Sequence, residues 1–147
     1  MSAAGTIVPG RYVIDMTTDP EAIRSLVALH AQLIDDGNVD ERVKLYTEDG
    51  ELVYAGVSSV GREALAKAFA STVDPQRLGR HMCVNTVVDL DDGRAEVRTD
   101  FMLVRASSTG VRVAAAGRYL DVMEKHAGQW LFRQRRVQVI ETPPPAP

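Results

Sequence analysis

The stretch HMCVNTVVDL-DDG-RAEVRTDFMLVRA, residues 81 to 106, decides the fold of this chain. Two long segments rich in apolar and β-branched residues flank an Asp-Asp-Gly turn, which is the pattern of an antiparallel hairpin. Turns at residues 107–110 and 126–128 separate two more such segments, 111–125 and 129–141. The second half of the chain therefore predicts a four-stranded antiparallel meander.

The first half predicts three helices and one short strand. Apolar residues recur at helical spacing after a Thr-Asp-Pro-Glu start signal and stop before Gly37, which suits a left-handed C-cap. In the second helix we expect Asp40, Glu41, Arg42 and Lys44 to face water. The predicted ranges are 20–36, 39–46 and 61–71 for the helices and 51–56 for the strand.

A long curved sheet wrapped around helices makes an α+β domain, and a curled sheet closed at one end by helices leaves a cone-shaped cavity. With 147 residues, 45% of them hydrophobic, the chain suits one such domain. We place it at residues 19–141. Residues 1–18 form an N-terminal extension, in which 12–14 could be an edge strand, and the proline-rich residues 142–147 are expected to be disordered.

The composition argues against several partner classes. The net charge is -3 and acidic and basic residues are interspersed, so the sequence shows no basic cluster of the kind that binds nucleic acid or an anionic membrane surface. No apolar stretch approaches the roughly 18 to 20 residues that cross a bilayer. The single cysteine, Cys83, cannot form an internal disulfide, so a cytoplasmic location is the default. The histidine spacing predicts no metal site, and no phosphate-binding loop or other cofactor motif is present.

His81 is the strongest candidate for chemistry. On a regular strand His81, Cys83, Asn85 and Val87 share one face, so Cys83 and Asn85 would flank the imidazole at the mouth of the cavity. An imidazole gives and takes protons near neutral pH. The alternative is a histidine that caps a loop or bonds a backbone carbonyl.

Three more residues could line the cavity. His30 lies in the middle of the first helix's apolar stripe, where it is either a satisfied core histidine or a cavity residue. Tyr54 could donate a hydrogen bond to a substrate oxygen, or be a half-buried strand tyrosine. Asp100 could be a second acid of the site, or a surface carboxylate paired with Arg98 or Arg118.

The three arginines on the last predicted strand have a simpler, structural interpretation. Arg133 and Arg135 should point to one side of the sheet and Arg136 to the other, as a solvated or dimer-facing surface.

The order of helices and strands is similar to that of the nuclear transport factor 2-like (NTF2-like) superfamily, and within it the chain resembles the SnoaL-like branch. The residues that carry the resemblance are Ile34-Asp35-Asp36-Gly37, Gly79-Arg80-His81, Asn85, Gly117-Arg118-Tyr119-Leu120-Asp121, Gly128-Gln129-Trp130 and Arg135-Arg136-Val137. The superfamily includes dehydratases, isomerases, cyclases and the small subunits of ring-hydroxylating dioxygenases, so a shared fold says little about reaction.

The resemblance to the dehydratase-like members implies that Asp35 and His81 line the cavity together. The helical wheel opposes this for Asp35, because it places Asp35 about 140° from His30 and away from the centre of the apolar stripe. A tyrosine often found five residues before the acid in these members is His30 here.

We expect a cofactor-independent enzyme that performs dehydration, isomerisation or cyclisation on a small hydrophobic, polyketide- or steroid-like substrate. His81 would act as general base and acid, Asp35 would assist it, and Tyr54 or Asp100 would hold a substrate oxygen. One alternative is a non-catalytic binding or assembly module. Another is a structural protein similar to a dioxygenase small subunit. The resemblance also implies a homodimer formed through the sheet.

Overall fold

A computed structural model describes residues 6–8, 12–14, 18–76 and 79–141, with the side chains of all but the first two ranges. The helices are α1 (Asp19–Asp35), α2 (Val39–Lys44) and α3 (Arg62–Ala70). The strands are β1 (Thr6–Val8), β2 (Tyr12–Ile14), β3 (Tyr46–Tyr54), β4 (Val57–Val60), β5 (Gly79–Asp91), β6 (Arg94–Ser107), β7 (Gly110–His126) and β8 (Gln129–Val139). The predicted tail at 142–147 lies outside the described residues.

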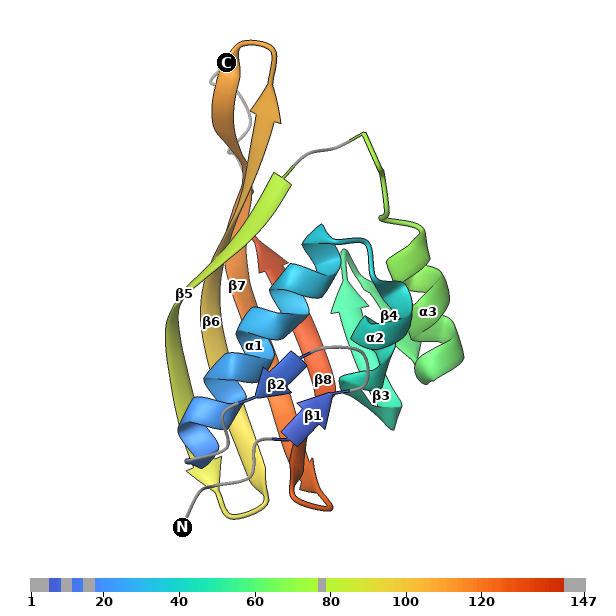
Figure 1. Ribbon diagram of the computed structural model, residues 1–147, viewed down its shortest axis with the longest axis vertical. Helices are drawn as coiled ribbons and strands as arrows, with labels where there is room; N and C mark the ends of the chain where they lie inside the picture. The colour runs from blue at the N-terminus through green and yellow to red at the C-terminus, as the bar shows by residue number, and fades with distance from the viewer. Residues whose placement is uncertain (1–5, 9–11, 15–17, 77–78, 142–147) are drawn as a thin grey trace.

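The main sheet has six strands in the order β4-β3-β8-β7-β6-β5. Strands β5 to β8 form the predicted antiparallel meander, and β3 joins it parallel to β8. Figure 1 shows α1 crossing the concave side of this curved sheet. The α+β class and the cone architecture are therefore confirmed.

Two strands differ from the sequence prediction. The expected edge strand at 12–14 is β2, and it pairs with β1 in a separate two-stranded sheet. Strand β4 was not predicted. It follows β3 through a two-residue turn in which Ala55 and Gly56 both have positive φ, the backbone geometry of a tight hairpin turn.

Capping hydrogen bonds define both ends of α1. The Thr18 hydroxyl accepts the backbone N–H of Glu21 at the start. At the other end Gly37 has φ +66°, and the N–H of Asn38 reaches back to the carbonyl of Leu33, which is a Schellman C-cap. The Asn38 side chain then caps α2. Asp35 is thus the last residue of α1.

The core lies between the helices and the concave face of the sheet. Its main contributors are one face of α1, α3 and the inward residues of β6 to β8, including Ile23, Leu26, Leu33, Phe69 and Phe132. Within the described ranges, no helix has the length and apolar character needed to cross a bilayer.

A bulge in β5 changes which residues face the core. Val84 pairs with Asp100 and Val87 with Arg98, so two residues of β5 oppose only one of β6. Asn85 lies in this bulge with φ +53° and is exposed, whereas Thr86 is partly covered. The prediction that Asn85 and Val87 share the face of His81 and Cys83 is therefore wrong, because a bulge reverses the alternation.

Candidate active site

Asp35 and His81 meet between the end of α1 and the start of β5. The carboxylate Oδ1 of Asp35 lies 2.7 Å from Nδ1 of His81. The backbone N–H of His81 also donates to both oxygens of the same carboxylate, at 3.1 and 3.0 Å. The side chains are 16% exposed for His81 and 6% for Asp35. The two residues that the family resemblance brings together therefore form a direct pair.

The helical wheel was misleading for Asp35. The wheel finds the side of α1 that faces the centre of the core, but β5 packs along α1 as well and covers a second side. Asp35 points to that second side and accepts three hydrogen bonds there.

This geometry sets the tautomer of His81. An ionised carboxylate only accepts hydrogen bonds, so Nδ1 of His81 carries the proton that points to Asp35. Nε2 is then the acceptor nitrogen of a neutral ring, and no described residue bonds to it. A slightly exposed imidazole with its outer nitrogen free can take a proton from a bound molecule.

The concave face beside His81 carries Cys83, Phe101 and Tyr119. Cys83 pairs with Phe101 across β5 and β6, and the rings of Phe101 and Tyr119 stack at 4.3 Å. Burial raises the pKa of the Cys83 thiol and keeps it protonated. Tyr119 is 5% exposed, and no described residue bonds to its hydroxyl. This phenol is a potential donor to a ligand that sequence reasoning missed.

A buried ion pair lies deeper in the same interior. Arg135 on β8 forms two hydrogen bonds of 2.8 Å with Asp121 on β7, and both are almost completely buried. The Arg135 guanidinium also stacks on Tyr119, 3.9 Å from the ring centre. Although burial alone lowers the pKa of Arg135, Asp121 outweighs that effect and raises it. The expectation that Arg135 lies on a solvated or dimer-facing surface is wrong, because a register shift in β8 turns it inward.

His30 is fully buried and touches this ion pair. Its Nδ1 lies 3.0 Å from a terminal nitrogen of Arg135, and its Nε2 lies 3.1 Å from the Tyr46 hydroxyl. Burial and the charges of Arg135 and Arg42 hold the pKa of His30 well below its usual value, so the ring is neutral. Of the two readings left open, the satisfied core histidine fits the contacts that the structure describes.

Arg42 is the other interior cation. Its guanidinium carbon lies 3.5 Å from the centre of the Phe69 ring, and its Nε lies 3.3 Å from Nε2 of His30. The residue is 9% exposed, so the prediction that Arg42 faces water is wrong. The cause is α3, which packs on α2 and covers the side chain.

Asn85 and Asp100 lie together on the opposite face of the sheet. Asn85 donates to Asp100 at 3.1 Å, and Nε of Arg118 donates to Asp100 at 2.6 Å. Thr99 and Phe101, which flank Asp100 in β6, are buried on the inner face, so Asp100 points outward. The structure does not bring either residue to the pair of Asp35 and His81, and the pairing of Asp100 with Arg118 is the surface alternative considered from sequence.

Tyr54 also lies away from the pair. It ends β3 beside the turn to β4 and is 49% exposed. Its suggested contact with a substrate oxygen has no support in this position.

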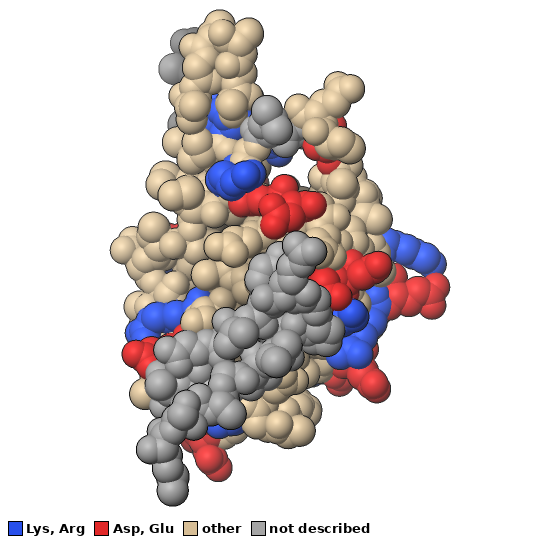
Figure 2. All heavy atoms as spheres, viewed as in Figure 1, with Lys and Arg blue, Asp and Glu red and all other residues tan. Residues whose placement is uncertain are grey.

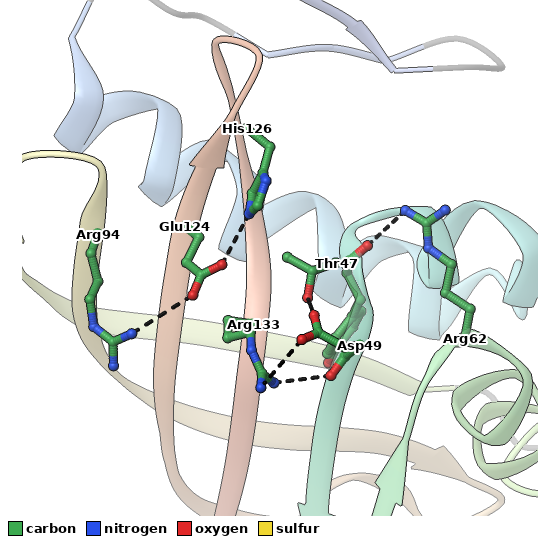
Figure 3. A network of polar contacts seen from close by, with 8 residues as sticks. Thr47, Asp49, Arg62, Arg94, Glu124, His126 and Arg133 are labelled. Atoms are coloured by element: carbon green, nitrogen blue, oxygen red, sulfur yellow. Dashed lines mark hydrogen bonds and ion pairs between the residues drawn. The ribbon is translucent and has the colours of Figure 1, made fainter.

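A second histidine and carboxylate pair lies at the surface. Nε2 of His126 is 3.0 Å from Glu124, which also faces Arg94 at 3.8 Å, as Figure 3 shows. The same view shows Asp49 between Thr47 and Arg133. The pair of His126 and Glu124 is exposed near a hairpin turn, which makes it a natural internal control for His81.

Charge is otherwise mixed over the visible surface. Figure 2 shows acidic side chains over the C-terminal end of α1 beside basic ones over the start of β5, and both signs are interspersed elsewhere. Among the described residues no three His, Cys, Asp or Glu side chains gather where they could hold a metal ion.

Comparison with known proteins identifies the domain type. The sequence pattern of the SnoaL-like domain matches residues 15–136. Among solved structures, a protein of unknown function from Mycobacterium tuberculosis is 25% identical with a TM-score of 0.74, over 82% of this chain and 70% of that one. No curated protein sequence matches the chain.

Two other structures share the fold at lower identity. A candidate scytalone dehydratase from Novosphingobium aromaticivorans is 22% identical, with a TM-score of 0.72 over 84% of this chain and 85% of that one. The beta subunit of a candidate aromatic-ring-hydroxylating dioxygenase from the same organism is 15% identical, with a TM-score of 0.68 over 82% and 88%. The fold thus occurs both in enzymes and in subunits of larger assemblies.

Proposed function

The chain belongs to the SnoaL-like domain family, and on that premise we propose that it is a cofactor-independent enzyme that moves protons on a small hydrophobic substrate. The reaction would be a dehydration, isomerisation or cyclisation, on a polyketide- or steroid-like molecule held against the concave face of the sheet. The observation that carries the proposal is the 2.7 Å contact between Asp35 and His81, which leaves Nε2 of His81 free.

The mechanism follows from the tautomer. Nε2 of His81 takes a proton from a carbon next to a substrate carbonyl, and the ring becomes an imidazolium. Asp35 stabilises that cation through Nδ1 and holds the ring in position. The same Nε2 then returns the proton, either to a leaving hydroxyl or to a different carbon. The Tyr119 hydroxyl supplies a hydrogen bond to the substrate oxygen that gains negative charge.

Hydrogen–deuterium exchange tests the proton transfer without knowledge of the natural substrate. The protein in D₂O is incubated with 2-tetralone and with a β-keto thioester, and loss of their acidic C–H signals is followed by proton NMR. We expect the wild-type protein to accelerate exchange over buffer. His81→Ala should lose about a hundredfold or more of that acceleration, and His126→Ala, which removes the exposed histidine, should keep it.

Two outcomes would count against the proposal. Full exchange activity in both His81→Ala and Asp35→Asn would remove the pair from the chemistry. No acceleration by the wild-type protein, together with measurable binding of the same ketones, would favour the non-catalytic binding module.

We also propose that the protein forms a homodimer through the outer face of the sheet. That face exposes the cross-strand neighbours Met82 and Met102, 49% and 38% exposed, with Val84 and Val87 close by on β5. These exposed apolar residues lie beside the polar group of Asn85, Asp100 and Arg118, and apolar surface rimmed by polar residues is typical of an interface.

A further inference from the structure

Two arginines lie directly opposite each other near the turn that joins β6 to β7. Arg105 on β6 is partly buried and pairs with Arg112 on β7, which is exposed. In the part of the chain that the structure describes, no carboxylate forms an ion pair with either guanidinium. Like charges directly opposite in a sheet repel each other, so this pair destabilises the hairpin unless a negative charge joins it.

Both arginines lie on the same side of the sheet as His81. Gly79 is two residues before His81 on β5, and residues two apart on a strand point to one face. A Cβ on Gly79 would lie 3.3 Å from Cγ of Arg105 and 3.4 Å from Cδ1 of Leu103. The side chain of Arg105 is therefore on the concave face with the His81 ring. Arg112, directly opposite Arg105, points to the same face.

The arginine pair lies one step beyond His81 on this face. His81 is opposite Leu103, which is opposite Ala115. Arg105 follows Leu103 by two residues, so the two rows are about 7 Å apart along the strands. Figure 2 shows basic side chains at this end of the molecule, beside the acidic ones at the end of α1. Leu103 and Ala115 are partly exposed, so a ligand can lie over them and reach both His81 and the arginines.

We propose that Arg105 and Arg112 bind an oxyanion at the outer end of the substrate, a carboxylate or a phosphate ester. Guanidinium groups form charge-assisted, two-pronged hydrogen bonds with both kinds of oxyanion. The bound anion also removes the repulsion between the two arginines. The inference rests on the proposed function for the position of the reacting carbon, at Nε2 of His81. It specifies the substrate as a molecule with an apolar body and an anionic end.

Three 2-tetralones that differ only at C6 test the site. One carries a carboxylate, one a phosphate ester and one an uncharged methoxy group. The value of kcat/KM for deuterium exchange is measured for each at low ionic strength and divided by its exchange rate in buffer. The wild-type protein should prefer the charged ketones by about tenfold, and added NaCl should reduce the preference. A preference for only one of the two anions identifies the group that the site binds.

Matched arginine variants locate the preference. Arg105→Gln and Arg112→Gln should each lose most of it, and Arg112→Lys should keep part of it because the charge remains without the fork. Arg98→Gln removes an exposed arginine from the outer face and should keep the full preference. Thermal unfolding followed by circular dichroism distinguishes a binding role from a structural one. Removal of one of two opposed like charges should leave Tm unchanged or raise it, whereas a structural role predicts a lower Tm.

Isothermal titration calorimetry with the same compounds separates the site from the proposed function. His81→Ala should lose deuterium exchange and still bind the charged tetralones more tightly than the methoxy compound. If the wild-type protein shows this binding preference but no exchange, the proposed function fails and the anion site stands. Equal affinity of the wild type for charged and uncharged compounds, absence of binding, or an unchanged preference in the double variant Arg105→Gln and Arg112→Gln would overturn the proposal.

Discussion

Asp35 holds His81 by its backbone and by its ring at once, since one carboxylate accepts both the main-chain N–H and the Nδ1–H of the histidine. The strand start and the imidazole are therefore positioned by the same residue at the end of α1. A side chain fixed in this way loses little rotamer freedom when a ligand binds.

The first prediction concerns the charge of Asp35. Asp35→Asn keeps the size of the side chain but removes the anion that stabilises the imidazolium. We expect deuterium exchange of 2-tetralone to fall by about a hundredfold or more, because the imidazolium loses its stabilising anion and the ring loses its orienting partner. Thermal unfolding followed by circular dichroism provides the control. An equal loss of activity and of folded protein would assign Asp35 a structural role only.

The second prediction concerns stability and pH. Burial holds the pKa of His30 in the folded protein well below its value of about 6.5 in the unfolded chain. The unfolded state therefore binds more protons between these values, and stability is complete above about pH 6.5 and falls as the pH decreases. The loss from this one group is at most about 1.4 kcal/mol per pH unit.

Urea unfolding at pH 7.5 and 5.5 measures this effect. His30→Gln, which cannot titrate in this range, should lose less stability between the two pH values than the wild-type protein. An identical pH dependence in both proteins would show that His30 is not the group responsible.

The third prediction concerns Gly117, which lies opposite Phe101 in the sheet. A Cβ at this position would overlap the carbonyl oxygen of Gln138 and crowd the Phe101 ring. Gly117→Ala should lower the free energy of unfolding by about 1 to 3 kcal/mol or more, because the backbone of β8 must move. Gly93→Ala is the control, since nothing lies within 4 Å of a Cβ there. A stable Gly117→Ala would mean that β7 and β8 are farther apart than described.

The fourth prediction concerns the dimer. Met82→Glu places a charge among the exposed apolar residues of the outer face and should convert a dimer to a monomer in light scattering at micromolar concentration. Val111→Glu changes a residue that is 72% exposed on a different part of the sheet and should leave the dimer intact. A wild-type protein that is monomeric would refute the interface.

The sequence predicted the fold well because its signals are local. Apolar periodicity, the Thr18 cap, Gly37 and the hairpin turns each specify a segment without reference to the rest of the chain. The same local signals do not locate Arg42, whose burial depends on α3 packing over α2.

The site could be predicted only in part, and the pairing of Asp35 with His81 came from the family resemblance. His81 and Asp35 are 46 residues apart, and only the contact of α1 with β5 brings them together. The bulge at Asn85 has no clear sequence signature, so strand alternation failed there. Arg135 and Asp121 were missed because a charged residue on a strand is usually assigned to the surface, and only their pairing across β7 and β8 explains their burial.

The most direct test of the central claim is the protonation of the His81 ring. In ¹⁵N-labelled protein at about pH 8, long-range ¹H–¹⁵N correlation NMR distinguishes the protonated from the unprotonated ring nitrogen, and His81→Ala assigns the signals. The proton should reside on Nδ1, facing Asp35, with Nε2 unprotonated and available as a base. A ring protonated at Nε2 would contradict the account, because His81 would then have no free nitrogen to accept a substrate proton.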